Sequence, residues 1–123
     1  MKSYTDLEQS KVLAKMLPIE SADMYWDYDV QKHEDYPMIM DDQFDNLCIP
    51  AWSLAALLDV LESEIDGEEG ETYKLNIEKD GTWWNVWYRE QYDEANPIET
   101  ESTEEPIDAC VEMILKLNEE NLL

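Results

Sequence analysis

The chain has 123 residues and carries 31 Asp and Glu against 8 Lys and Arg, which gives a formal net charge of −23. The acidic excess argues against direct binding to nucleic-acid phosphates and to anionic membrane surfaces. Hydrophobic residues make up 44% of the sequence, which is ordinary globular usage and argues against wholesale disorder. A chain of this length fits one domain, so we expect residues 1–123 to form a single domain.

The sequence offers no signal for secretion or membrane insertion. Residues 1–10 contain no apolar segment of the kind found in signal peptides, and the longest strongly apolar stretch, 49–58, is much shorter than a membrane span. Cys48 and Cys110 form no C-x-x-C pair, and in a chain without a signal peptide they favour reduced core thiols over a disulfide. We therefore expect a soluble, cytoplasmic protein.

The first predicted element is a helix over about Asp6–Leu17. Thr5 is suited to cap its N-terminus, and Glu8 three residues later would complete a capping box. Pro18 would end the helix, because the residue before a proline is pushed out of the α conformation.

The next segment, Met24–Val30, alternates in polarity and predicts a β-strand. Met24 and Trp26 would lie on one face, whereas Tyr25 would lie with two aspartates on the solvent-facing side. Residues His33–Pro37 keep no period and predict a loop, after which residues 38–40 suggest a short edge strand.

The apolar stretch after Pro50 predicts a central core helix, with Ser53 or Pro50 at its start. Residues 59–71 then carry acids, glycines and no base, which predicts an acidic loop. The large side chains that recur at helical spacing are Trp52, Leu54, Leu57, Leu58 and Leu61.

The strongest local pattern is a β-hairpin with strands at 73–79 and 82–89, joined by Asp80-Gly81 in a type I′ turn. This turn would place Lys79 opposite Thr82 and Lys74 opposite Trp87. The expected faces are Tyr73, Leu75, Ile77, Trp84, Val86 and Tyr88 on one side, and Lys74, Asn76, Glu78, Trp83, Asn85 and Trp87 on the other.

The last predicted elements are an acidic loop over 92–105 and a helix that starts at Pro106, a favoured first-turn residue. Helices on either side of an antiparallel hairpin predict an α+β fold, a small antiparallel sheet packed with about three helices. The expected buried stripe of the last helix is Ile107, Cys110, Met113, Ile114 and Leu117.

Four segments spread over most of the chain carry a resemblance: Glu8–Lys11, Pro18–Met24, Trp52–Leu58 and Asp108–Leu117. Together they resemble an uncharacterised family of short acidic proteins encoded by phages and mobile elements of gut bacteria. The resemblance implies a setting, a phage or integrated element in a bacterial cell, and no activity. It carries over no functional residue, because the shared segments are structural.

Residues that support catalysis are scarce. His33, the single histidine, lies among charged residues in a predicted loop, which favours a solvated surface side chain over a general base. A cysteine nucleophile needs a base to form thiolate, and nothing in the sequence places His33 beside Cys48 or Cys110. No P-loop or dinucleotide fingerprint is present. We predict no enzyme, no cofactor and no specific small-molecule ligand.

The abundant carboxylates offer one metal pattern. Residues 62–67 place oxygens at alternate positions before a glycine, as calcium loops do. However, Glu62 would be the first ligand, and the twelfth position is Tyr73, where a bidentate glutamate is required. Zinc is disfavoured because Cys and His clusters are lacking. We predict no specific metal site.

The reverse face of the hairpin is the candidate interaction surface, because it carries Trp83 and Trp87 with Lys74 and Arg89 beside them. Exposed aromatic side chains with an arginine nearby are typical of protein interfaces. Two structural alternatives stay open: a helix packs on this face, or Lys74 covers Trp87 through a cation–π contact.

These features favour a non-enzymatic accessory protein of a phage or mobile element that binds another protein or a second copy of itself. The alternative is an acidic inhibitor that imitates DNA, with the clusters at 59–71 and 93–105 standing in for phosphates. A further interpretation is that the acids only keep the surface solvated.

Overall fold

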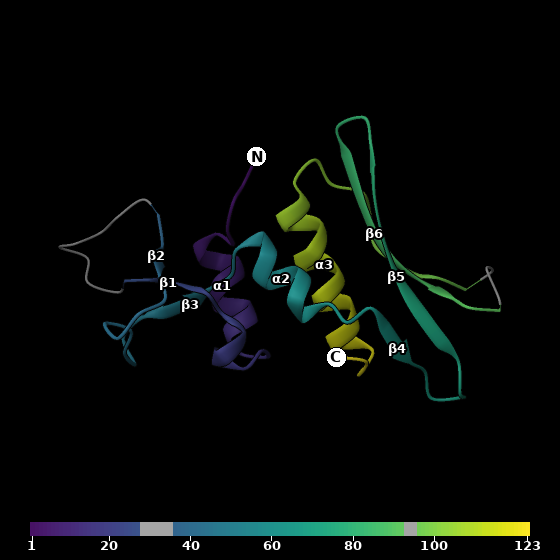
Figure 1. Ribbon diagram of the computed structural model, residues 1–123, viewed down its shortest axis with the longest axis horizontal. Coiled ribbons are helices and arrows are strands. Elements are labelled where there is room, and N and C mark those ends of the chain that lie inside the picture. Colours follow the sequence, from purple (N-terminus) through teal and green to yellow (C-terminus); the bar gives the residue numbers. More distant parts are fainter. Residues whose placement is uncertain (28–35, 93–95) are drawn as a thin grey trace. The chain divides into compact units, whose positions relative to one another are not determined.

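The computed structural model describes residues 1–27, 36–92 and 96–123, and the chain divides into two compact units (Figure 1). One unit comprises Lys2–Val60, and the other comprises Met1 with Leu61–Leu123. Each unit combines helix with an antiparallel sheet, so the predicted α+β class is confirmed. The single-domain organisation of the whole chain stays a prediction.

The Lys2–Val60 unit is built on a three-stranded antiparallel sheet in the order β2-β1-β3. The short edge strand predicted near residues 38–40 is present as β2. In chain order the elements are α1 (Leu7–Ala14), the 3₁₀ helix η1 (Ile19–Ser21), β1 (Met24–Trp26), β2 (Met38–Ile39), β3 (Ile49–Ala51) and α2 (Leu54–Val60).

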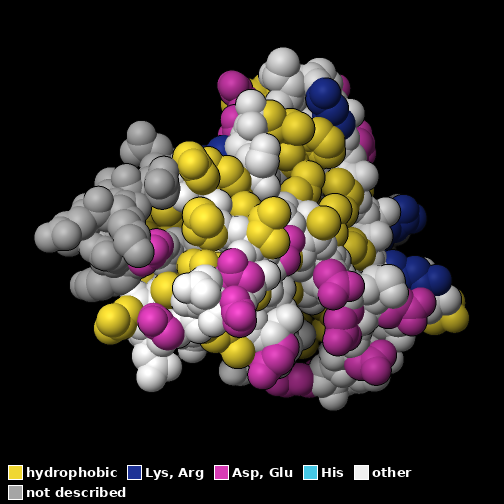
Figure 2. Space-filling view, turned by 60° about the vertical axis from the view of Figure 1, so that its left-hand side comes forward, with side chains coloured by type: hydrophobic (Ala, Val, Ile, Leu, Met, Phe, Trp, Pro, Cys, Tyr) yellow, Lys and Arg dark blue, Asp and Glu magenta, His cyan; other side chains and the backbone are white. Residues whose placement is uncertain are grey.

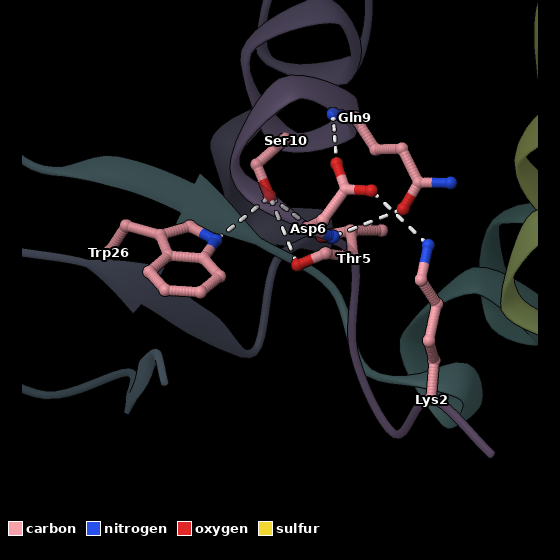
Figure 3. Close-up of polar contacts among 6 residues, drawn as sticks. All are labelled: Lys2, Thr5, Asp6, Gln9, Ser10 and Trp26. Carbon is pink, nitrogen blue, oxygen red and sulfur yellow. Dashed lines mark hydrogen bonds and ion pairs between the residues drawn. The ribbon is translucent and has the colours of Figure 1, made fainter. Parts of the chain in front are cut away.

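The cap of α1 differs from the prediction by one residue. Asp6, not Thr5, is the N-cap: its carboxylate accepts a hydrogen bond from the Gln9 N–H at 2.8 Å, and the Gln9 side chain accepts from the Asp6 N–H at 3.0 Å (Figure 3). Gln9 therefore closes the capping box instead of Glu8. Thr5 does not cap the helix because its hydroxyl accepts a hydrogen bond from the Trp52 N–H at 3.1 Å.

Two buried hydroxyl groups lie between α1 and the sheet. Thr5 and Ser10 are fully buried, and their side-chain oxygens are 2.8 Å apart. The Trp26 indole N–H donates to the Ser10 oxygen at 3.2 Å (Figure 3), and the Trp52 indole N–H donates to Ser21 at 3.0 Å. Buried polar groups are costly unless they are paired, so these bonds fix how the segments meet.

The prediction that Tyr25 faces solvent is wrong. Tyr25 is 3% exposed, its hydroxyl donates to an Asp41 carboxylate oxygen at 2.9 Å, and the ring of Phe44 packs edge-on against it. A tyrosine can be buried in this way because its polar tip finds a partner while its ring packs. The remainder of the predicted strand, 28–30, and the loop residue His33 lie outside the described residues.

The second predicted helix is present as α2, with Ser53 as its cap. The Ser53 hydroxyl oxygen accepts a hydrogen bond from the Ala56 N–H at 3.2 Å, and the Asp23 carboxylate accepts from both the N–H and the hydroxyl of Ser53. Pro50 belongs to β3 instead of the helix, and Trp52 is buried just before α2 begins.

The Leu61–Leu123 unit is a four-stranded antiparallel sheet, in the order β4-β5-β6-β7, with one helix. The predicted helix from Pro106 is confirmed, and all five residues of its expected stripe are buried. In chain order the elements are β4 (Glu64–Asp66), β5 (Thr72–Asp80), β6 (Trp83–Glu90), β7 (Ile98–Glu99) and α3 (Pro106–Glu119).

Both predicted acidic loops contain a strand. Residues 59–71 include β4, which pairs with β5, and residues 92–105 include β7, which pairs with β6. In β4 the side chain of Ile65 is buried whereas Glu64 and Asp66 are exposed. Because strand side chains alternate, the acids stay solvated while the backbone extends the ladder, and the repulsion between them does not prevent pairing.

The hairpin forms with the predicted faces but with a shifted register. Lys79 pairs with Trp84 and Asp80 pairs with Trp83, so the turn residues are Gly81 and Thr82. Gly81 has φ of +63° whereas Thr82 has no positive φ, which is the pattern of a type II′ turn with glycine first. Each residue's partner moves by two positions, and this even shift leaves every side chain on its predicted face.

The helix α3 packs against β6, along the face of the sheet that carries the buried residues Val86 and Tyr88 (Figure 1). The Tyr88 hydroxyl donates to the backbone C=O of Glu62 at 2.6 Å. We call this side of the sheet the inner face. The opposite side is the outer face.

Candidate interaction surface

The outer face carries all four residues that the sequence singles out. Lys74 lies on β5, and Trp83, Trp87 and Arg89 lie at alternate positions of β6, out of phase with the buried Val86. The sequence also allows a helix to pack on this face. The helix α3 does not do so, because it covers the inner face.

The two tryptophans differ in their surroundings. Trp83 lies beside the turn, opposite Asp80, and is 48% exposed. Trp87 lies in the middle of the sheet between Asn76 on β5 and Glu99 on β7, and it is half-buried. The outer face therefore offers one protruding indole and one that is part of the sheet surface.

The two cations lie directly opposite each other, because Lys74 pairs with Arg89 in the ladder. The prediction that Lys74 lies opposite Trp87 is therefore wrong, and the cation–π contact in this hairpin joins Lys79 to Trp84 instead, at 5.6 Å. Like charges opposite one another destabilise a strand pair, and the Glu64 carboxylate, 3.8 Å from the Lys74 ammonium group, offsets that repulsion.

Carboxylates surround this aromatic and cationic centre. We call them the acidic rim, because they lie on the two outer strands of the sheet and at the tip of the hairpin. All of them are exposed. The acidic rim consists of Glu64 and Asp66 on β4, Glu78 and Asp80 on β5, and Glu99 on β7.

A shallow depression of about 360 Å³ opens where β7 leaves β6. Trp87 pairs with Glu99 and Trp84 bridges to Thr103, so one extra residue is inserted on the 99–103 side, as in a β-bulge. The Thr100 hydroxyl oxygen is buried there and has no hydrogen-bond partner among the described residues. The depression is lined by Glu78, Asn85, Val86, Trp87, Arg89, Pro97, Glu99 and Thr100.

The sequence does not predict this depression, because the depression depends on the bulge. The polar segment 92–105 predicts a loop, and no local pattern shows that residues 98–103 would follow β6. The one signal available is the isolated apolar side chain of Ile98, which is buried in the structure between exposed neighbours.

The two cysteine thiols are poorly suited to nucleophilic chemistry. Burial raises the pKa of Cys110 to about 11. Burial also raises the pKa of Cys48, and the negative charge of Asp45 acts in the same direction. Both cysteines are free thiols. A pairing of Cys48 with His33 falls outside the described residues, and the absence of enzymatic activity stays a prediction.

In the part of the chain that the structure describes, no three His, Cys, Asp or Glu side chains gather in a way that could hold a metal ion, and the calcium-like segment 62–67 contributes strand β4. None of the helices described is long and apolar enough to cross a membrane. Comparison with protein-family models, curated proteins and solved structures gave no match to this chain.

Proposed function

We propose that this protein acts without catalysis, as an accessory protein that binds another protein through the outer face of its four-stranded sheet. The resemblance to proteins of phages and mobile elements gives the setting, a bacterial cell. The observation that carries the proposal is the exposure of Trp83 on the same sheet face as half-buried Trp87, a face that α3 leaves uncovered.

The composition of the outer face supports this function. Tryptophan and arginine are the side chains that most often dominate binding energy at protein interfaces, and here Trp83, Trp87 and Arg89 alternate along one strand. The acidic rim around them would select a partner whose contact surface has a basic periphery. It would also speed the encounter with such a partner at low ionic strength.

The proposal is tested by capture from bacterial lysate with tagged protein. We expect Trp83→Ala and Trp87→Ala each to lower recovery of a specific partner at least about tenfold, since interface tryptophans are worth about 2 kcal/mol or more. Tyr92→Ala is the matched control, because Tyr92 is an 88% exposed aromatic residue of the same unit that is outside the outer face. Equal recovery by all three variants would contradict the proposal.

A second candidate function is imitation of DNA, which is favoured by the net charge of −23 and by carboxylates on both outer strands of the sheet. Figure 2 shows one face of the molecule, where acidic side chains gather mainly in the lower part of the view and are interleaved with hydrophobic and polar ones. Imitation of a phosphate row would need carboxylates in line, whereas the acidic rim surrounds Trp87 and the cations Lys74 and Arg89, so this function ranks second.

The same capture experiment separates the two functions. A DNA-imitating protein would recover a nucleic-acid-binding protein that duplex DNA displaces and that high salt releases. Neutralising the acids of 59–71 or 93–105 would then weaken recovery more than Trp83→Ala does. A partner that stays bound in salt and in excess DNA, and that is lost in the tryptophan variants, supports binding through the outer face.

A further inference from the structure

One side of β5 is left without a neighbouring strand near the hairpin tip. The direction of its backbone groups follows from two hydrogen bonds: Leu75 donates its N–H to Ser63 on the β4 side, and the Thr72 C=O accepts from Gln91 on the β6 side. Because the direction alternates along a strand, Ile77 and Lys79, like Leu75, direct both N–H and C=O away from β6.

The pairing with β4 does not reach these residues. β4 begins at Glu64, which lies opposite Lys74, and the last bond on this side is the one from Leu75 to Ser63. Within the described residues, no strand pairs with residues 76–80 on the side away from β6. The N–H and C=O groups of Ile77 and Lys79 thus form a short, open β-edge.

The side chains along this edge are exposed in a regular pattern. Ile77 points to the inner face and is 42% exposed, although its neighbours along that face, Val86 and Tyr88, are buried. Glu78 and Asp80 point to the outer face and are exposed. The edge therefore presents Ile77 on the inner face, beside Lys79 whose ammonium group lies over Trp84, and two carboxylates on the outer face.

We propose that residues 76–80 of β5 bind an extended segment of another protein by strand addition. Backbone hydrogen bonds to Ile77 and Lys79 would supply the attachment, and alternate side chains would supply the selectivity. The segment would carry Lys or Arg at the two positions facing Glu78 and Asp80, and an apolar residue beside Ile77. Glu78 and Asp80 also belong to the acidic rim, but the outward N–H and C=O groups of Ile77 and Lys79 lie along the edge of the sheet, so the inference does not depend on the proposed function.

A second copy of the chain is a poor occupant of the same edge. An antiparallel pairing of two copies that uses all of residues 76–80 is centred on Glu78, which would place the two Glu78 carboxylates directly opposite each other. Each copy also carries a net charge of −23, so approach of two copies is opposed over long range. A basic segment meets neither obstacle.

The competing structural explanation is that Glu78, Lys79 and Asp80 protect the edge against aggregation, since charged residues commonly have this role at sheet edges. A protective edge would bind no peptide in a backbone-dependent manner. The two explanations therefore differ in whether the outward N–H and C=O groups are used.

The test uses a fluorescent peptide in which lysine alternates with valine, titrated into the full chain and followed by anisotropy. Lys79→Pro removes the outward N–H, whereas Lys79→Ala keeps it, and both variants lose the contact of Lys79 with Trp84. Proline is tolerated on an edge strand where its nitrogen faces away from the ladder. We expect Lys79→Pro to bind the peptide about five- to tenfold more weakly than Lys79→Ala.

Two further arms and one control keep the test decisive if Lys79→Pro folds poorly. A peptide N-methylated at alternate residues of its centre keeps the charge but loses the donors, and it should bind the unaltered protein at least about fivefold more weakly. Glu78→Lys should weaken the lysine peptide and favour one with glutamate in its place. Tyr92→Ala, a change at an exposed aromatic residue outside both the edge and the outer face, should leave the affinity unchanged. Absence of binding, or equal binding of methylated and unmethylated peptides, would overturn the proposal.

Discussion

The two units of this chain stabilise their small cores by different interactions. In the Lys2–Val60 unit the strands have two or three residues, and side-chain hydrogen bonds join segments that are distant in sequence, as between Thr5 and Trp52. In the Leu61–Leu123 unit a long hairpin supplies backbone bonds between near neighbours, and the apolar stripe of α3 covers one face. The first unit adds specific buried polar pairs to an apolar core that includes Leu13 and Leu57. The second depends mainly on apolar burial.

The difference matters for where a binding surface can form. A sheet that is stabilised by its own ladder and by a helix on one face can leave the other face to solvent, so Trp83 and Arg89 are exposed without loss of the fold. In the first unit, by contrast, the aromatic residues Trp26 and Trp52 use their indole N–H groups to bind the serines that hold its segments together. The indole N–H groups of Trp26 and Trp52 are structural in the first unit, whereas Trp83 of the second unit is exposed.

The largest expected effect comes from the apolar core of α3. Ile114 is fully buried, and Ile114→Ala should lower the free energy of unfolding by about 2–5 kcal/mol, because it removes buried methyl groups and leaves a cavity. Glu112→Ala, an exposed change in the same helix, should stay within about 0.5 kcal/mol. Urea unfolding measures both variants. An Ile114→Ala cost as small as that of the control would break the claim that the second unit depends on apolar burial.

A smaller effect is expected from the hydroxyl pair in the first unit. Thr5→Val keeps the shape of the side chain but leaves the buried N–H of Trp52 without its acceptor, which should cost about 1–3 kcal/mol. Thr82→Val, at an exposed turn position, is the control. Hydrogen exchange at the Trp52 amide should speed up in Thr5→Val alone.

A double-mutant cycle with Ser10→Ala sharpens this test. The two hydroxyl groups contact each other at 2.8 Å, so the costs of the two changes should fail to add by about 0.5 kcal/mol or more. Strict additivity of the two costs would mean that the hydroxyl groups contribute independently. That result would weaken the contrast between the two units.

The two units also differ in how far the sequence predicts them. The faces of the hairpin and the stripe of α3 follow from periods of two and of three to four residues, which are local and visible in the sequence. The placement of Thr5 and Tyr25 depends on Trp52 and Asp41, partners that no local period identifies. Their assignments as cap and surface residue were wrong for that reason.

The outer face shows the same limit of local sequence patterns, here for the pairing of individual residues. Alternation was sufficient to place Lys74, Trp83, Trp87 and Arg89 on one face, but not to decide which residues are opposite each other. That choice depended on the turn: Gly81 occupies the first turn position, where a type II′ turn accepts glycine, and the expected Asp80-Gly81 turn would have required positive φ at Asp80. The depression beside Trp87 required the bulge near Thr100, which leaves no pattern in the sequence.

The smallest expected effect is that of removing the hydroxyl group from one buried tyrosine in each unit. Burial is the main reason that the pKa values of Tyr25 and Tyr88 are raised from 10 to about 12, and nearby charges from Asp41 and Glu62 act in the same direction. A raised pKa means that the neutral phenol is favoured in the folded state. The stabilisation is therefore complete below pH 10 and is lost as the pH rises from 10 through 12.

Tyr88→Phe should cost about 1 kcal/mol at neutral pH, since it removes one hydrogen bond to the backbone C=O of Glu62. It should also abolish the share of alkaline destabilisation that Tyr88 contributes. Tyr25→Phe leaves the Asp41 carboxylate, which is exposed, to water. Its cost at neutral pH should therefore be the smaller of the two, whereas its effect above pH 10 should be similar. Unfolding free energies measured at neutral pH and near pH 11 test this order, and an unchanged alkaline slope in both variants would contradict the assignment of these tyrosines as buried neutral phenols.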